Sequence, residues 1–316
     1  MRRSVAVVTL LAPWVLPGFA VAQDVPRAPT FGVEVDIVKV TVTVFDDAGK
    51  AVTGLEREDF EVFEDRELQR IDLFAKAYEP GDDETLEVDL GLLLDTSESM
   101  LDVLEETQSA AARFLEAIPR ARDLLMVFFD HDIRVSRYDS EHQQGLIRRL
   151  HDAKGGGQTA LYDAITVYLS RVYGVGGRQV MVLFSDGEDS SSSITMGETL
   201  ELVRSSNVAI YPIAFVSKPG RLHFATRPMA FLRQIASLTG GEMFLPTGTR
   251  TLPEIYDEIV AQLESQYVIG FVSSQGRRAK AGYRKLEVKV KKDDLEARHR
   301  DGYFATVPPG AEAPDG

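Results

Sequence analysis

The chain of 316 residues carries 35 lysines and arginines against 49 aspartates and glutamates, a formal net charge of −14, and no cysteine. This composition, with 44% apolar residues, is typical of an acidic globular protein and argues against a disordered chain or a nucleic-acid packing protein. The lack of cysteine in the sequence excludes disulfides, thiol nucleophiles, cysteine-ligated zinc or iron–sulfur sites and a lipid-modified cysteine.

Residues 1–22 have the pattern of a secretory signal peptide. Two arginines precede an apolar stretch, and Ala20-Val21-Ala22 has the small-x-small form of a cleavage site. An uncleaved membrane anchor is the alternative, but Pro13 and Pro17 interrupt a stretch that is already short for a membrane span. We therefore expect a mature protein that begins near Gln23, is exported to the periplasm or secreted, and has no transmembrane segment after cleavage.

Residues 23–85 are expected to form an N-terminal β segment. From residue 33 apolar side chains alternate at a period of two, which is typical of half-buried strands. The phase of this alternation changes between Ile37 and Val38, which predicts a β-bulge or a switch of faces. At Glu64-Asp65-Arg66 a hairpin turn lacks the glycine that commonly fills such positions, so several turn geometries remain open.

Residues 86–266 change to apolar runs separated by amphipathic stretches. Near-continuous apolar runs are typical of parallel strands that are covered on both faces. Thr251-Leu252-Pro253-Glu254 is a capping box that predicts the start of a helix. Strands that alternate with helices indicate an α/β domain with a central, mostly parallel sheet and right-handed crossovers. The apolar runs are residues 90–94, 124–129, 180–184 and 209–215.

Residues 267–305 return to a β pattern. From Leu286 apolar residues alternate with charged ones, and the stretch 273–282, rich in glycine, serine and basic residues, is expected to be the connection of a hairpin. Because neither terminal β segment has enough strands to be stable alone, we expect 267–305 to pair with 31–80 in a small β-sandwich, with the α/β domain inserted in it or flanked by it. The tail, residues 306–316, is expected to be disordered.

Oxygen-bearing side chains follow the ends of predicted strands in the α/β region. Asp95, Ser97 and Ser99 occupy alternate positions after the first strand, Thr159 follows a glycine run and opens a helix, and Asp186 ends another strand. Open α/β sheets bind ligands in the crevice beyond the carboxyl ends of their strands. Hydroxyl, carboxylate and water oxygens in an octahedral array suit a hard divalent cation. The sequence therefore predicts a site for Mg²⁺ or Mn²⁺ in preference to Ca²⁺.

These residues, in this order and in this strand and helix context, resemble the metal-ion-dependent adhesion site (MIDAS) of the von Willebrand factor A (VWA) domain family, over roughly residues 86–266. The flanking β segments are similar to those of a bacterial group of VWA-related proteins. The resemblance implies a Rossmann-like VWA domain. It also implies that Ser97, Ser99 and Thr159 contact the metal directly or in alternate states, that Asp95 and Asp186 bind it directly or through water, and that an acidic residue of a protein partner completes the coordination.

Three of the ligand candidates also have a simple structural explanation. Ser99 and Thr159 are residue types that commonly cap helices, and Asp186-Gly187 is a common turn. Five such groups at the strand ends of one α/β unit favour the metal site over these explanations. Other acids at the same rim are expected to be solvated loop charges, or to surround the ion without touching it. They are Asp130, which is expected to lie closest, Glu98, Glu188, Asp132 and Asp189.

Other classes of function find less support in the sequence. A metal-dependent hydrolase is one alternative, since a divalent ion can activate water, but the chain has no HExxH, GxSxG or complete P-loop motif. A scaffold in an envelope complex is another alternative. Nucleic-acid binding is not expected because the chain is acidic and the basic residues of 284–292 alternate with apolar ones. We therefore predict an exported, non-enzymatic adhesion or interaction module that captures a partner carboxylate through a divalent cation.

Overall fold

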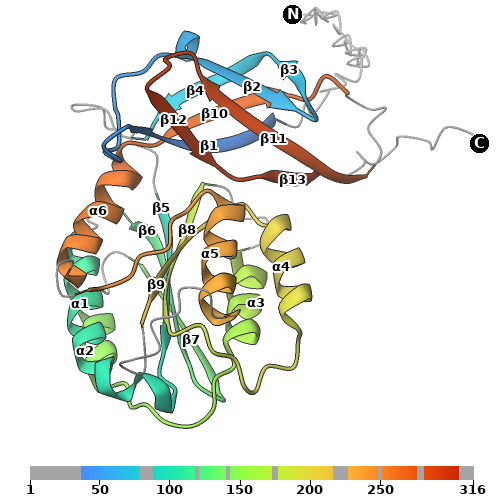
Figure 1. Cartoon of the computed structure of the whole chain (residues 1–316). Coiled ribbons are helices and arrows are strands. Elements are labelled where there is room, and N and C mark those ends of the chain that lie inside the picture. Colours follow the sequence, from blue (N-terminus) through green and yellow to red (C-terminus); the bar gives the residue numbers. More distant parts are fainter. Residues whose placement is uncertain are drawn as a thin grey trace, which may run out of the picture. The chain divides into compact units, whose positions relative to one another are not determined.

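The computed structural model describes residues 37–77, 88–117, 121–139, 143–172, 177–215, 227–247, 251–275 and 281–305. The predicted signal peptide and the predicted disordered tail lie outside this part of the chain. The described strands form two small antiparallel sheets and one larger sheet flanked by helices (Figure 1). Every helix among the described residues is too short or too polar to cross a bilayer.

The larger sheet has the strand order β7-β6-β5-β8-β9. Four of its strands run parallel, and β7 pairs antiparallel with β6 at one edge. The chain passes from β5 to β6 on one side and later to β8 on the other, so the winding direction reverses at β5. Ligands of open α/β sheets bind at such a reversal. The strands are β5 (Val88–Asp95), β6 (Ala121–Phe129), β7 (Ile133–Asp139), β8 (Arg178–Ser185) and β9 (Val208–Ala214).

Helices cover both faces of this sheet. Every residue of β5 and β8 is buried, which explains their near-continuous apolar sequences. Alternate residues of these strands face opposite cores, as Leu92 and Leu93 do. Helices α1 (Leu104–Ala117), α2 (Gln143–Asp152) and α6 (Leu252–Glu264) cover one face, and α3 (Leu161–Val172), α4 (Met196–Ser205) and α5 (Arg227–Thr239) cover the other (Figure 1).

Two local features of this domain follow directly from residue type. The predicted capping box at the start of α6 is confirmed, because the N–H of Thr251 donates to Oε2 of Glu254 at 2.8 Å. In the middle of β5, Gly91 makes room for a neighbour: a Cβ at this position would lie 2.0 Å from the ring of Tyr168 on α3. The Tyr168 ring is fully buried, and its hydroxyl donates to the carbonyl of Val180 at 3.2 Å.

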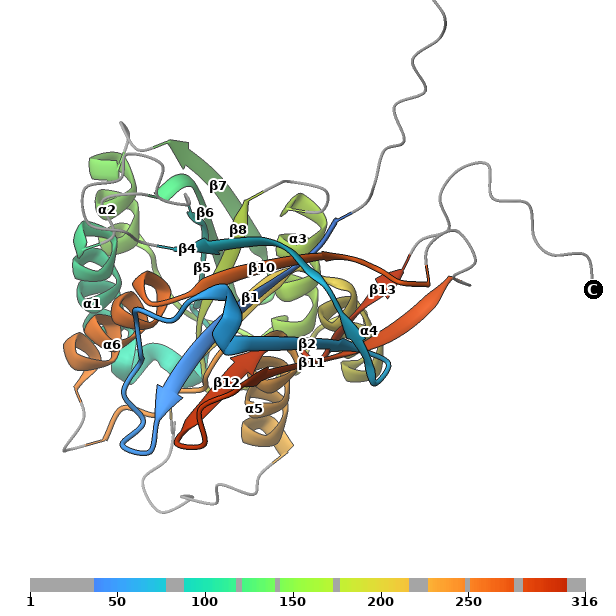
Figure 2. The same ribbon diagram turned by 90° about the horizontal axis from the view of Figure 1, so that it is seen from above.

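The strands before and after the α/β domain form a β-sandwich, as predicted. One sheet has the order β12-β1-β10-β4 and the other β13-β11-β2-β3, so each sheet combines strands from both ends of the chain. Figure 2 shows β2 beside β11 and β1 beside β10. Val42, Phe60, Ile269 and Val288 belong to the core between the sheets. The strands are β1 (Ile37–Asp46), β2 (Phe60–Glu64), β3 (Glu67–Gln69), β4 (Ile71–Lys76), β10 (Tyr267–Val272), β11 (Gly282–Val290), β12 (Leu295–His299) and β13 (Gly302–Ala305).

One sequence expectation for the sandwich is wrong, and another is wrong in one of its two alternatives. The register of β1 against β10 is unbroken from Ile37 onward, so the phase change at this point is no bulge; the alternative, a switch of faces, depends on residues 33–36, which lie outside the described residues. Ile37 lies at the exposed start of the strand, outside the core. The segment after β10 is not a hairpin connection, because β10 and β11 belong to different sheets. An alternating pattern shows which face of a strand is buried, but it does not identify the neighbouring strand.

The turn between β2 and β3 adopts a conformation that usually requires glycine. Asp65 and Arg66 have φ values of 48° and 75°, as in a type I′ hairpin turn. Oδ1 of Asp65 accepts the N–H of Lys285 at 3.0 Å, and its Oδ2 accepts Nη1 of Arg284 at 3.0 Å. These bonds hold the turn against β11, and they explain how the chain forms this hairpin without a glycine.

Candidate metal site

The first group of predicted ligands lies in the turn that follows β5. Asp95 is the last residue of β5 and is fully buried. Its Oδ1 accepts the N–H of Ser97 at 3.0 Å, and the hydroxyl oxygens of Ser97 and Ser99 lie 3.2 Å apart. Ser99 lies inside the short 3-10 helix η2 (Glu98–Val103), which has Ser97 as its N-cap residue, so the helix-cap explanation for Ser99 is wrong. The turn places two hydroxyls side by side next to a buried carboxylate.

Asp186 supplies a second buried carboxylate, directly after β8. Its Oδ1 accepts the N–H of Glu188 at 3.0 Å, as expected for a turn. Its Oδ2 is buried and has no hydrogen-bond partner. A carboxylate oxygen that is buried without a donor is costly, and buried polar atoms are nearly always satisfied. The turn explanation therefore accounts for only one of the two oxygens of Asp186.

Ser185 connects the two aspartates. Its hydroxyl donates to Oδ2 of Asp95 at 2.7 Å and accepts the N–H of Gly187 at 2.9 Å. Burial raises the pKa of Asp95 to about 7; hydrogen bonds from Ser97 and Ser185 oppose this rise, and the charge of Asp186 adds to it. A nearby cation would favour the ionised form of both carboxylates. The only sequence signal for Ser185 is a hydroxyl at the end of an otherwise apolar strand.

Thr159, the remaining predicted ligand, is buried and lies two residues before α3. The N–H groups of the first turn of α3 are bound by the loop after β8. The N–H of Tyr162 donates to Asp189 at 3.2 Å, and the N–H of Asp163 donates to Ser192 at 3.1 Å. Neither bond uses the Thr159 hydroxyl, so these contacts do not support the helix-cap explanation for Thr159.

The glycine run before Thr159 packs against the turn after β5. The N–H of Gly156 donates to the carbonyl of Thr96 at 2.7 Å, and the N–H of Glu98 donates to the carbonyl of Gly157 at 3.1 Å. A Cβ at Gly155 would lie 2.8 Å from the Thr96 carbonyl oxygen. Glycine thus permits the close backbone approach that ties the Thr159 segment to the Asp95 segment.

The acids predicted to surround the ion differ in their environments. Asp130 is buried, and its Oδ2 accepts Nη2 of Arg134 at 2.8 Å and the Thr96 hydroxyl at 3.2 Å. Although burial favours the neutral acid, hydrogen bonds from Arg134 and the Asp132 N–H lower the pKa of Asp130. Asp130 therefore supports the residue between Asp95 and Ser97, a role that sequence reasoning missed. The side chains of two other acids, Glu98 and Glu188, are exposed.

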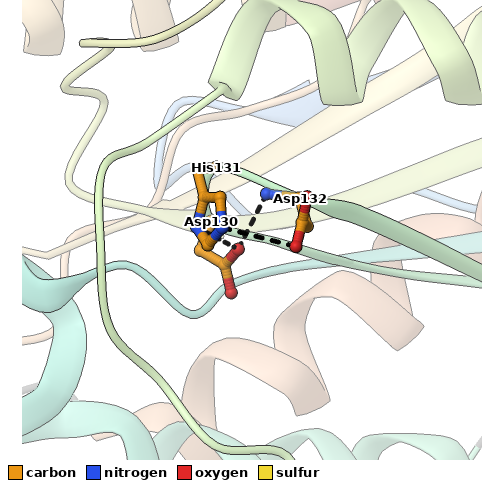
Figure 3. A group of neighbouring side chains, drawn as sticks. All are labelled: Asp130, His131 and Asp132. Carbon is orange, nitrogen blue, oxygen red and sulfur yellow. Dashed lines mark hydrogen bonds and ion pairs between the residues drawn. The ribbon is translucent and has the colours of Figure 1, made fainter.

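His131 lies between Asp130 and Asp132 in the turn from β6 to β7 (Figure 3). Its Nδ1 is 3.2 Å from Oδ1 of Asp130, and its Nε2 is 3.3 Å from Oδ2 of Asp132. One ligand atom from each residue lies within 4.8 Å of the others. Because Arg134 already pairs with Asp130, and His131 and Asp132 are exposed, a hydrogen-bonded turn explains this group better than a second metal site.

The five predicted ligands thus lie at the carboxyl ends of β5 and β8 and just before α3, in three chain segments that are joined by hydrogen bonds. The donors are carboxylates and hydroxyls, which are the oxygen ligands preferred by hard divalent cations. The unpartnered oxygen of Asp186 and the raised pKa of Asp95 both fit a bound cation.

The family model for the von Willebrand factor type A domain matches residues 89–258, which is more than half of the chain. No curated protein matches the chain. Similar solved structures include a von Willebrand factor type A protein from Catenulispora acidiphila (12% identity, covering 85% of this chain and 72% of that chain, TM-score 0.48). They also include BatB from Bacteroides thetaiotaomicron (16% identity, covering 55% of this chain and 98% of that chain, TM-score 0.43). A third is mussel byssus proximal thread matrix protein 1 with a zinc-occupied MIDAS motif (19% identity, covering 58% of this chain and 46% of that chain, TM-score 0.44). The chain belongs to the von Willebrand factor type A domain family, whose members are typically metal-dependent protein-interaction modules.

Proposed function

We propose that this protein is an exported binding module that holds a divalent cation, Mg²⁺ or Mn²⁺ in preference to Ca²⁺, and captures a carboxylate of a protein partner through it. The proposal includes no catalytic step. The observation that carries it is the buried Oδ2 of Asp186, which has no hydrogen-bond partner. The charge of Asp186 also adds to the rise that burial causes in the pKa of Asp95. The proposed ligands are Asp95, Ser97, Ser99, Thr159 and Asp186.

The arrangement of the ligands explains why a partner would be needed. Side chains from three loops hold the ion from the protein side, while an octahedral ion keeps its remaining positions for water or an external ligand. An anionic oxygen that replaces water gains more from the ion than a neutral one does. A carboxylate of a partner is the protein group that supplies such an oxygen.

Thermal unfolding of the mature chain, residues 23–316, tests the cation site. A cation at about a hundred times its dissociation constant that binds only the native state adds roughly 2.7 kcal/mol, which raises the Tm by roughly 4 °C for a cooperative unit of about 290 residues. Chelator, Mg²⁺, Mn²⁺ and Ca²⁺ are compared in the wild type, in Asp186→Ala and in Glu188→Gln. Asp186→Ala should lose the shift, whereas Glu188→Gln, which neutralises an exposed acid on the same loop, should keep it. An equal shift in the wild type and Asp186→Ala would refute the site.

Capture of a carboxylate is tested with Mn²⁺ bound to the protein. Exchangeable water on Mn²⁺ accelerates the relaxation of water protons, so a ligand that displaces this water lowers the relaxation rate. Acetate should lower it and acetamide, its neutral counterpart, should not. Equal effects of the two compounds would contradict recognition of an anionic oxygen.

A further inference from the structure

The loop after Asp186 is fastened to the segment that carries Thr159. We call residues 189–193 the clasp loop. The hydroxyl of Ser190 accepts the N–H of Thr159 at 3.0 Å. In the opposite direction, the N–H groups of Ser190 and Ser191 donate to the carbonyl of Thr159 at 2.9 and 3.0 Å. Both backbone polar groups of Thr159 are therefore held by a loop that begins three residues after Asp186.

The rest of the clasp loop binds the first turn of α3. Asp189 accepts the N–H of Tyr162, and Ser192 accepts the N–H of Asp163. In return, the carboxylate of Asp163 accepts the N–H of Ser193 at 2.8 Å and its hydroxyl at 3.0 Å. Hydrogen bonds thus join the segment that carries Thr159 to the loop that follows Asp186, although the two residues lie far apart in the sequence.

Among the serines of the clasp loop, Ser190 differs in the partner of its side chain. Its side-chain bond is made to the backbone of a proposed ligand. The Ser193 hydroxyl bonds to the helix that follows, and the Ser192 hydroxyl bonds to that helix and to Asp189 of the clasp loop. Ser190 is exposed, so its side chain adds little to the core. Removing its hydroxyl should leave the N–H of Thr159 without its partner, while the Thr159 carbonyl keeps its bonds to the N–H groups of Ser190 and Ser191 and the packing of the domain stays intact.

We infer that Ser190 is a positioning residue of the metal site: its hydroxyl fixes the peptide of Thr159, and so the place of the Thr159 hydroxyl relative to Asp186. This inference rests on the proposed function. Mg²⁺ demands near-ideal octahedral geometry, whereas Ca²⁺ accepts irregular and variable coordination. A loosened Thr159 should therefore weaken Mg²⁺ binding more than Ca²⁺ binding. The clasp loop would then contribute to the choice of metal through a residue that does not touch it.

Calorimetric titration of the chelator-treated full chain with Mg²⁺ alone and with Ca²⁺ alone tests this inference. Loss of a group that supports a metal ligand typically weakens affinity by about 10- to 100-fold. Ser190→Ala should lower the affinity for Mg²⁺ by about tenfold or more and the affinity for Ca²⁺ by less than about threefold. Ser190→Thr, which keeps the hydroxyl, should bind both ions as the wild type does. Ser193→Ala, the matched control on the same loop, should also leave both affinities unchanged.

Three results would overturn the inference. If Ser190→Ala binds Mg²⁺ as tightly as the wild type does, the positioning role is wrong and the metal site remains. If the affinities of Ser190→Ala for both ions fall by the same factor and its Tm falls, general weakening of the loop explains the lower affinities. If the wild type binds neither ion, and Asp186→Ala behaves like it, the proposed function fails and the role of Ser190 fails with it.

Discussion

Acidification should destabilise this protein through His299, a largely buried residue at the end of β12. Its Nε2 accepts the N–H of Val288 at 3.0 Å, and its Nδ1 donates to the carbonyl of Arg300 at 2.8 Å. Both nitrogens of the neutral ring are therefore in use, and a proton added to Nε2 would face an N–H group. Burial lowers the pKa of His299 below 6.5; the Arg300 carbonyl and the charges of Asp301 and Glu287 oppose this fall, and the guanidinium of Arg300 adds to it.

The sign of the effect follows from this lowered pKa. As the pH falls through about 6.5, the unfolded chain binds a proton that the native state does not, so the free energy of unfolding decreases. The slope approaches about 1.4 kcal/mol per pH unit. If the native ring stays neutral throughout, the loss between pH 7.5 and pH 5.5 is about 1.4 kcal/mol, which is the upper limit for a single histidine.

Urea unfolding at pH 7.5, 6.5 and 5.5 measures this loss, with His299→Gln as the comparison. Glutamine offers a side-chain oxygen to the N–H of Val288 and does not titrate. Subtracting the two stability curves removes the titration of all other groups, and the wild type should lose up to about 1.4 kcal/mol relative to the variant on acidification. Parallel curves, or a relative gain by the wild type at pH 5.5, would refute the reasoning.

Two further substitutions test packing and backbone geometry. Gly91→Ala should lower the free energy of unfolding by about 2–3 kcal/mol, because the new Cβ meets the Tyr168 ring. The free energy lost through Gly91→Ala should be smaller when it is measured in the Tyr168→Leu variant. If the effects of the two substitutions simply add, a clash between the new Cβ and the Tyr168 ring is not the cause. Arg66→Gly should stabilise the protein by about 0.5 kcal/mol, because relief of a positive φ outweighs the added freedom of the unfolded chain. Arg66→Val should lower the Tm, and equal Tm values for the two variants would argue against the type I′ turn.

The elements that sequence analysis predicted well are those with an unambiguous local pattern. β5 and β8 are buried on both faces and are apolar almost throughout. The start of α6 carries its own capping box. β7 was missed because it is an edge strand in which only Ile133, Val135 and Tyr138 are apolar, too few for a clear signal.

In the candidate site, too, the residues that could be predicted are those that form a local sequence pattern. Its proposed ligands have a recognisable spacing along the chain. The groups that support them do not: Ser185 contacts Asp95 across 90 positions, and Ser190 contacts Thr159 across 31. Such contacts arise only when the sheet brings its strand ends together, and a single sequence contains no periodic signal for them.

A backbone hydrogen bond joins the two chain segments at which the α/β domain leaves and rejoins the sandwich. The N–H of Ala77 donates to the carbonyl of Gln266 at 2.7 Å, and the adjacent Lys76 and Tyr267 pair across β4 and β10. For a flexible chain, closing a loop of about 190 residues costs roughly 3 kcal/mol more entropy than closing a loop of ten. A domain that has already folded replaces most of that loop with a rigid body. During synthesis β1 to β4 emerge before the α/β domain and lack their C-terminal partner strands until that domain has been made, so the sandwich can be completed only after the α/β domain has been synthesised.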